Sequence, residues 1–117
     1  MRIVTFEAFD VVVVSFPFAD RAATKRRPAL VLSDRAAFNA SIGHVVLAMI
    51  TSASHLDWPL DVTVSDLHAA GLSSPSVVRM KLFTLDERLI LRKAGTLAAA
   101  DRKAVAAALS KLLKPLA

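Results

Sequence analysis

Phe16-Pro17-Phe18-Ala19-Asp20, followed after a short gap by Lys25-Arg26-Arg27-Pro28-Ala29-Leu30-Val31-Leu32-Ser33, is the stretch that decides the fold of this chain. An apolar run from Val11 to Phe18 ends in a polar loop, and a second apolar run opens on a cationic cluster and a proline. Runs rich in β-branched and aromatic residues between turn residues predict strands. Proline also holds the residue before it in an extended backbone state. We therefore expect Arg27 at the rim of a sheet, where its guanidinium can meet an anion.

Short apolar runs separated by turn residues continue along the chain. Strands are predicted at Val11–Phe18, Ala29–Ser33, His44–Ile50, Leu60–Val64 and Ser76–Leu82, a polar loop at Asp20–Arg27, and short helical or turn pieces at Asp34–Asn39, Ser65–Gly71 and Thr84–Arg88. A helix is predicted from about Ala98 to Lys114, because its apolar residues form one stripe, and Gly95 and Thr96 supply a turn and an N-cap before it. The pattern predicts a mainly β fold with a C-terminal helix, a small antiparallel sheet or partly open barrel.

Composition limits the class of protein. The chain has 117 residues, which predicts a single domain over 1–117, and it has no cysteine for a disulfide or a thiolate metal site. Mean hydropathy is +0.51, yet no apolar run approaches the roughly 20 residues that cross a bilayer. The N-terminus has no signal-peptide pattern, so we expect a cytoplasmic homodimer with a deep core and no membrane contact. A net charge of +5 favours a nucleic acid or an acidic protein segment as partner, although an indifferent basic surface is the alternative.

Several polar residues stand where strands end. Thr51 follows the strand at His44–Ile50, and its hydroxyl, with that of Ser52, is a candidate donor to a phosphate oxygen beside Arg27; a local cap is the simpler reading. Arg79 and Lys81 share one face of a predicted strand, which indicates either an anion between them or an exposed basic face.

The histidines show no metal-ligand spacing, so neither a metal nor a cofactor is expected. His55, a few residues after Thr51, is the histidine expected to approach these groups. Trp58 is either a platform on which a base stacks or an anchor for its loop.

These segments resemble a known family. The Phe-Pro-Phe-x-Asp stretch, the Lys-x-Arg-Pro-Ala-Leu-Val-Leu-Ser stretch and Ile50-Thr51-Ser52 are similar to the MazF/PemK family of ribosome-independent toxin endoribonucleases, over most of the chain from about Asp10. The resemblance implies an SH3-like barrel (MazF/PemK/CcdB-like), usually dimeric. It also implies sequence-specific cleavage of single-stranded RNA, as by an mRNA interferase, to 2′,3′-cyclic phosphate and 5′-hydroxyl ends. The implied partners are RNA and a cognate antitoxin with a disordered, often acidic tail.

The resemblance also supplies roles for residues. Arg27, Thr51 and Arg79 are the expected catalytic residues of a metal-independent reaction. The expected RNA-binding residues are Lys25, Arg26, Ser52, His55 and Lys81. Arginine is a poor proton acceptor near neutral pH, so the general base is left among His55, Asp20 and water.

Two positions depart from the family pattern. Lys81 stands where some members have an aspartate, and Phe9-Asp10 replaces the usual Gly-Asp before the first strand. Phenylalanine tolerates a positive φ poorly, so we expect a different turn there. Two alternatives to the nuclease remain: a non-catalytic barrel that acts by binding a protein, as gyrase poisons of this fold do, and an inactive nucleic-acid-binding module.

Overall fold

The computed structural model describes residues 5–17 and 24–116, and only the backbone of Phe16, Pro17, Thr24, Lys25 and Leu116. The strands are β1 (Asp10–Pro17), β2 (Thr24–Val31), β3 (His44–Ser52), β4 (Val62–Thr63), β5 (Ser76–Asp86) and β6 (Ile90–Thr96). The α-helices are α1 (Ala40–Ile42), α2 (Leu67–Ala70) and α3 (Ala99–Leu112), and the other helical turns are η1 (Arg35–Asn39), η2 (Glu87–Leu89) and η3 (Lys114–Leu116). The prediction of a mainly β fold with a C-terminal helix is confirmed. No helix among the described residues is long and apolar enough to cross a membrane.

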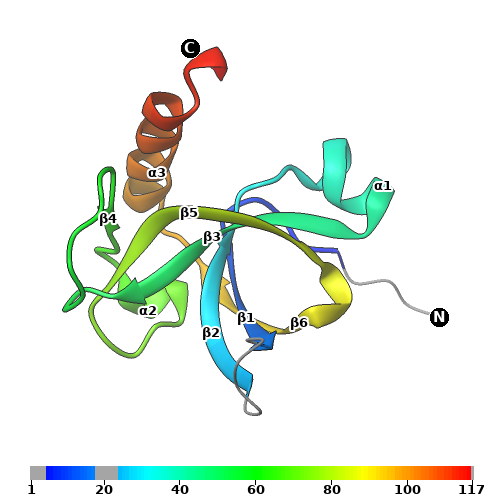
Figure 1. Cartoon of the computed structure of the whole chain (residues 1–117), viewed down its shortest axis with the longest axis horizontal. Helices are drawn as coiled ribbons and strands as arrows, with labels where there is room; N and C mark the ends of the chain where they lie inside the picture. Colours follow the sequence, from blue (N-terminus) through cyan, green and yellow to red (C-terminus); the bar gives the residue numbers. More distant parts are fainter. Residues whose placement is uncertain (1–4, 18–23, 117) are drawn as a thin grey trace.

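The strands form one curved sheet in the order β4-β5-β3-β2-β1-β6, with every neighbouring pair antiparallel (Figure 1). Helix α3 packs against β4 and β5, and α2 packs against β6. Strand β2 pairs with β1 from Thr24 to Leu30, whereas its pairing with β3 covers only residues 29–31. The N-terminal half of β2 therefore extends past the end of its pairing with β3.

Side chains alternate between the two faces of the sheet, and each face carries its own apolar cluster. We call the first the α3 face; its buried cluster includes Val11, Leu30, Ala48, Ile50, Val78 and, from the helix, Val105. We call the second the Phe6 face; its buried cluster comprises Phe6, Val12, Val14, Ala29, Val31, Val45 and Leu47. Val11, Val12 and Val14 are fully buried, which confirms that the first strand is covered on both sides.

Several predicted boundaries were wrong. Residues 24–27 lie in β2 rather than in the predicted loop, because β1 pairs with them. Strand β6 was missed, since Arg92, Lys93 and Gly95 interrupt its apolar pattern and its pairing with β1 is what orders it. Strand β5 continues to Asp86, which leaves η2 in place of the predicted helical turn. The N-cap of α3 is Ala98 and not Thr96.

The turn before β1 keeps the conformation that glycine would favour. Phe9 has a φ of 74°, so the expectation of a different turn was wrong. Its amide donates to the carbonyl of Val31 at 2.7 Å, and its carbonyl accepts from the amide of Leu97 at 3.1 Å. A non-glycine residue in this region costs about 1–2 kcal/mol. Packing of the ring offsets this cost, because it lies against the cluster of the α3 face and under the Arg102 guanidinium, 5.7 Å from the ring centroid.

A buried carboxylate ties the start of α3 to the loop after β4. Asp101 is 4 % exposed and accepts from the amides of Ser65 and Asp66 and from the Ser65 hydroxyl, at 2.7–3.1 Å. Burial alone would raise the pKa of Asp101, but the Ser65 hydroxyl and the two amides outweigh it and lower the pKa below its usual range. The negative charge also suits the first turn of the helix.

We expect Asp101→Asn to lower the free energy of unfolding at pH 7 by about 2–3 kcal/mol, because the charged acceptor of three donors is lost. A carboxyl whose pKa falls on folding stabilises the protein above its unfolded pKa, and this contribution disappears as the pH falls through the folded pKa. The difference between the wild type and the variant should therefore shrink as the pH drops below about 4. Urea unfolding at pH 7 and at a pH below about 4 measures this difference in the free energy of unfolding. Asp57→Asn, at an exposed position, is the control. A pH-independent difference would contradict this account.

Candidate active site

The three predicted catalytic residues project from one face of three adjacent strands. Ala29 of β2 pairs with Met49 of β3, which pairs with Arg79 of β5. Directly paired residues point to the same face, and residues two apart on a strand share a face. Arg79, Thr51 and Arg27 therefore all lie on the Phe6 face. Thr51 is a diagonal neighbour of Arg79, a relation that spans about 7–8 Å in a sheet.

Arg27 and Thr51 occupy corresponding positions on facing strands. Each lies two residues beyond the last β2–β3 pair, Ala29 with Met49. The prediction that the arginine is held by its backbone agrees with the ladder, in which Arg27 pairs with Val14. Its side chain is half-buried, and its Nε is buried with no hydrogen-bond partner among the described residues. A buried donor without a partner is costly, so this guanidinium is prepared to receive an acceptor.

Thr51 is coupled to His55. The Thr51 hydroxyl lies 2.7 Å from Nδ1 of His55, and the donor of this bond depends on the imidazole tautomer. Both residues are accessible, the threonine partly and the histidine fully. The predicted approach of His55 to Thr51 is therefore observed, and it places a group that can accept or release a proton beside the hydroxyl.

Arg79 is held by an acid that the sequence analysis did not name. It is 8 % exposed; its Nε donates to Oδ1 of Asp61 at 3.2 Å, and its Nη2 donates to Oδ2 of Asp61 at 3.0 Å and to the carbonyl of Leu56 at 2.6 Å. The hydrogen bond from Arg79 holds the pKa of Asp61 below its usual value, and the same bond raises the pKa of Arg79. The hydrogen bonds among described residues use Nε and Nη2, which leaves Nη1 for another acceptor.

Trp58 covers this ion pair. The Arg79 guanidinium lies 5.2 Å and the Lys81 ammonium 5.9 Å from the centroid of its ring, so the two cations share a face as predicted. The turn that carries the ring is closed by hydrogen bonds in both directions between Trp58 and Asp61, and Leu60 within it has a φ of 68°. The tryptophan therefore anchors its loop while part of its ring stays accessible.

Other predicted residues lie elsewhere. Ser52 follows Thr51, so it points to the α3 face, where its hydroxyl contacts that of Ser54 at 2.8 Å. Arg26 likewise points away from Arg27 and lines a cavity on the α3 face. Lys25 lies in β2, with its side chain outside the described part, and Asp20 lies outside the described residues. Within residues 5–17 and 24–116, no three side chains of His, Cys, Asp or Glu group as metal ligands would.

Asp61 is the functional residue that sequence reasoning missed. The alternating run Leu60–Val64 predicted a strand that includes Asp61, whereas β4 covers only Val62–Thr63, and nothing in that run shows which strand it pairs with. The pairing of Val62 with Val78 brings Asp61 level with Arg79. The only available signal in the sequence was an acidic residue near the start of a predicted strand, together with Arg79, for which no acidic partner was predicted.

Comparison with known proteins identifies the family of this chain. The model of the family described as "PemK-like, MazF-like toxin of type II toxin-antitoxin system" matches residues 7–113. No curated protein sequence matches significantly. Among solved structures, MazF from Deinococcus radiodurans is 29% identical and superposes with a TM-score of 0.73, covering 96% of this chain and 99% of its own.

Further solved structures share the fold. The MazE–MazF complex from Deinococcus radiodurans is 29% identical with a TM-score of 0.74, over 92% of this chain and 95% of that one. The toxin MazF-mt6 from Mycobacterium tuberculosis is 24% identical with a TM-score of 0.70, over 90% and 96%, which shows the fold alone. With nearly its whole length matched by the family model, this chain belongs to the PemK-like, MazF-like toxins of type II toxin–antitoxin systems.

Proposed function

We propose that this toxin is a metal-independent endoribonuclease that cleaves single-stranded RNA at specific sequences. The observation that carries the proposal is the projection of Arg27, Thr51 and Arg79 from one face of β2, β3 and β5. Two guanidiniums and a hydroxyl are donors that match a phosphate. The net charge of +5 favours the approach of a polyanion.

The reaction that these groups suit takes its nucleophile from the substrate. The 2′-oxygen of a ribose attacks the adjacent phosphorus, the bond from phosphorus to the 5′-oxygen breaks, and the products are a 2′,3′-cyclic phosphate and a 5′-hydroxyl. The protein needs to align these atoms and to stabilise the negative charge that develops on the phosphoryl oxygens. We assign that stabilisation to Arg27 and to Nη1 of Arg79, with the Thr51 hydroxyl as a third donor.

The 2′-hydroxyl must lose a proton and the leaving 5′-oxygen must gain one. Histidine is the side chain that most often carries protons in catalysis. His55 already lies at hydrogen-bond distance from Thr51. It is therefore our candidate for one proton transfer, with water for the other.

In EDTA, the wild-type protein is expected to cleave mixed single-stranded RNA, and Thr51→Ala to cleave it about 10- to 100-fold more slowly, because a donor to a charged oxygen is lost. Ser52→Ala is the matched control, since its hydroxyl points to the other face. Gel assays give the rates, and end-group analysis identifies the cyclic phosphate.

Three outcomes would count against the proposal. Equal activity in the wild type and in variants of Thr51 and Arg27 would indicate a contaminating nuclease. RNA bound but left intact would indicate a nucleic-acid-binding module. A toxin that does not act on RNA and tolerates Arg27→Ala would fit the protein-binding alternative.

We also propose two protein partners. An acidic antitoxin segment suits the basic surface, and MazF of Deinococcus radiodurans was solved with MazE. A second copy of the chain suits an apolar groove of about 250 Å³ between the sheet and α3, lined in part by Leu82, Leu109 and Leu113. Leu112 and Leu113 are 39% and 41% exposed. Light scattering should therefore give the mass of a dimer, and Leu113→Glu should give the mass of a monomer.

A further inference from the structure

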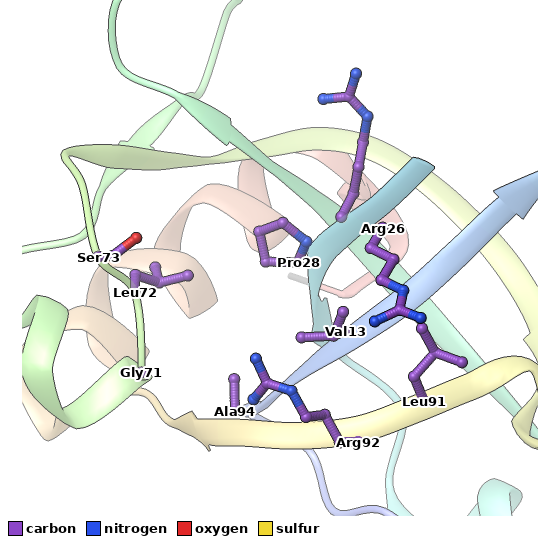
Figure 2. Close-up of a pocket in the computed structure, with 10 residues that line it drawn as sticks. Val13, Arg26, Pro28, Gly71, Leu72, Ser73, Leu91, Arg92 and Ala94 are labelled. Atoms are coloured by element: carbon purple, nitrogen blue, oxygen red, sulfur yellow. The ribbon is translucent and has the colours of Figure 1, made fainter. Parts of the chain in front are cut away.

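A second basic surface lies on the α3 face of the sheet, opposite the Phe6 face that carries Thr51. It is a cavity of about 470 Å³ formed by β1, β2, β6 and the loop that follows α2. Figure 2 shows the guanidiniums of Arg26 and Arg92 on either side of Val13, with Pro28 and Leu72 also at the cavity. Ligand pockets commonly fall in the range of about 300–1,000 Å³, so the space suffices for a small group such as one nucleotide.

The wall of this cavity is held rigidly. Gly71 has a φ of 72°, and a Cβ on it would lie 2.1 Å from the carbonyl oxygen of Ala94 in β6. A Cβ on Gly95 would lie 2.4 Å from the carbonyl oxygen of Ala69. Helix α2 and the glycine that follows it are therefore pressed against β6 at two points where no side chain fits, which preserves the shape of the cavity.

The charge at the cavity is one-sided. Arg26, Arg27 and Arg92 line it, and none of its lining residues is acidic. Neither Arg26 nor Arg92 takes part in an ion pair between described residues. Leu91, which also lines the cavity, is 49% exposed. Free guanidiniums beside an exposed apolar wall match a ligand with a phosphate and a flat apolar ring.

The cavity is continuous with the proposed catalytic surface. Arg27 lines the cavity, and it also projects from the Phe6 face, as Thr51 does. Strand β3 stops pairing with β2 at Ala29, so β3 does not cover this edge of β2 at Arg27 and Pro28. A chain bound at Arg27 can pass this edge and reach the other face.

We propose that the cavity binds one nucleotide of single-stranded RNA that flanks the cleaved linkage. Arg26 and Arg92 hold its phosphate, and Pro28 and Leu72 pack against its base. The proposal rests on the proposed function, because it places this nucleotide on the same strand as the scissile phosphate. It predicts that RNA long enough to reach both faces binds more tightly than RNA that reaches one.

Binding of RNA that cannot be cleaved tests the proposal separately from catalysis. Fluorescence anisotropy would measure the affinity of the protein for random tetranucleotides and random dodecanucleotides of 2′-O-methyl RNA, which lacks the free 2′-hydroxyl that the proposed reaction uses as its nucleophile. Arg26→Gln and Arg92→Gln are each expected to weaken dodecanucleotide binding about tenfold and to leave tetranucleotide binding within about twofold. The slope of log affinity against log salt should become shallower by about 0.7 for each phosphate that the variant no longer neutralises. Leu72→Ala should weaken dodecanucleotide binding without changing that slope.

Arg88→Gln is the control, because it removes one exposed guanidinium away from the cavity. The proposal fails if Arg26→Gln and Arg92→Gln weaken both RNA lengths equally, or no more than Arg88→Gln does. It also fails if they abolish binding of a poly-glutamate peptide and spare RNA, which would make the occupant an acidic peptide. Absence of cleavage by the wild type would refute the nuclease alone, because the length dependence of binding is measured without cleavage.

Discussion

Arg27→Ala is expected to lower kcat for RNA cleavage by on the order of 10²–10³-fold, the loss typical of one preorganised donor to transition-state charge. The guanidinium is half-buried and its Nε has no partner among the described residues, so no folded-state hydrogen bond of that atom is lost. Single-turnover cleavage in EDTA measures kcat, and urea unfolding checks that the variant stays folded.

Arg27→Lys and Arg88→Ala complete this experiment. Lysine keeps the charge but lacks the planar fork, so most of the loss should remain. Arg88 is an exposed arginine paired with Asp86, so its removal should leave kcat unchanged. Full activity in Arg27→Ala would remove Arg27 from the reaction and would contradict the proposed catalytic set.

Asp61→Ala is expected to lower cleavage by on the order of 10²-fold, because a catalytic group displaced by about 1 Å can lose that much. Asp61 supplies two of the three hydrogen bonds that hold Arg79, and both side chains are largely buried, at 13% and 10% exposure. The loss should appear in kcat more than in KM if Asp61 positions Arg79 for the transition state.

Trp58 reports on the same displacement. It is the single tryptophan of the chain, and its ring lies 5.2 Å from the Arg79 guanidinium. We expect its emission to shift in Asp61→Ala and to stay constant in Glu7→Ala, which removes an exposed acid far from this loop in the chain. Asp61→Asn should retain part of the activity, since the amide oxygen can still accept from Arg79. An unchanged kcat with a shifted emission would confine Asp61 to a structural role.

This ion pair gives a physical account of Lys81. Some relatives of this toxin are expected to carry an acid two residues after the arginine, and here that position holds a lysine. The carboxylate that neutralises Arg79 comes instead from the turn before β4. Lys81 lies over the accessible ring of Trp58, where it adds positive charge beside Arg79.

Local pattern predicted much of the fold and of the candidate site. The valines of β1 predicted a strand covered on both faces, and Thr51, predicted to follow a strand, is the penultimate residue of β3. The pattern failed where pairing overrides composition. Strand β6 contains Arg92, Lys93 and Gly95, and it is ordered by β1 rather than by its own residues. Phe9 keeps a positive φ because its amide and carbonyl are both bonded to residues distant in the chain, Val31 of β2 and Leu97 just after β6.

The amino-acid sequence by itself determined most of the strands, β6 and residues 24–27 excepted, the alternation of their side chains, and the backbone state of Arg27 before Pro28, because these depend on neighbours along the chain. Tertiary structure alone decided that β4 pairs with β5, which brings Asp61 to Arg79, and that Arg26 and Arg27 serve opposite faces of β2 at the end of its pairing with β3. The reason is that register joins residues far apart in the chain, and the burial of both faces of the sheet selects that register.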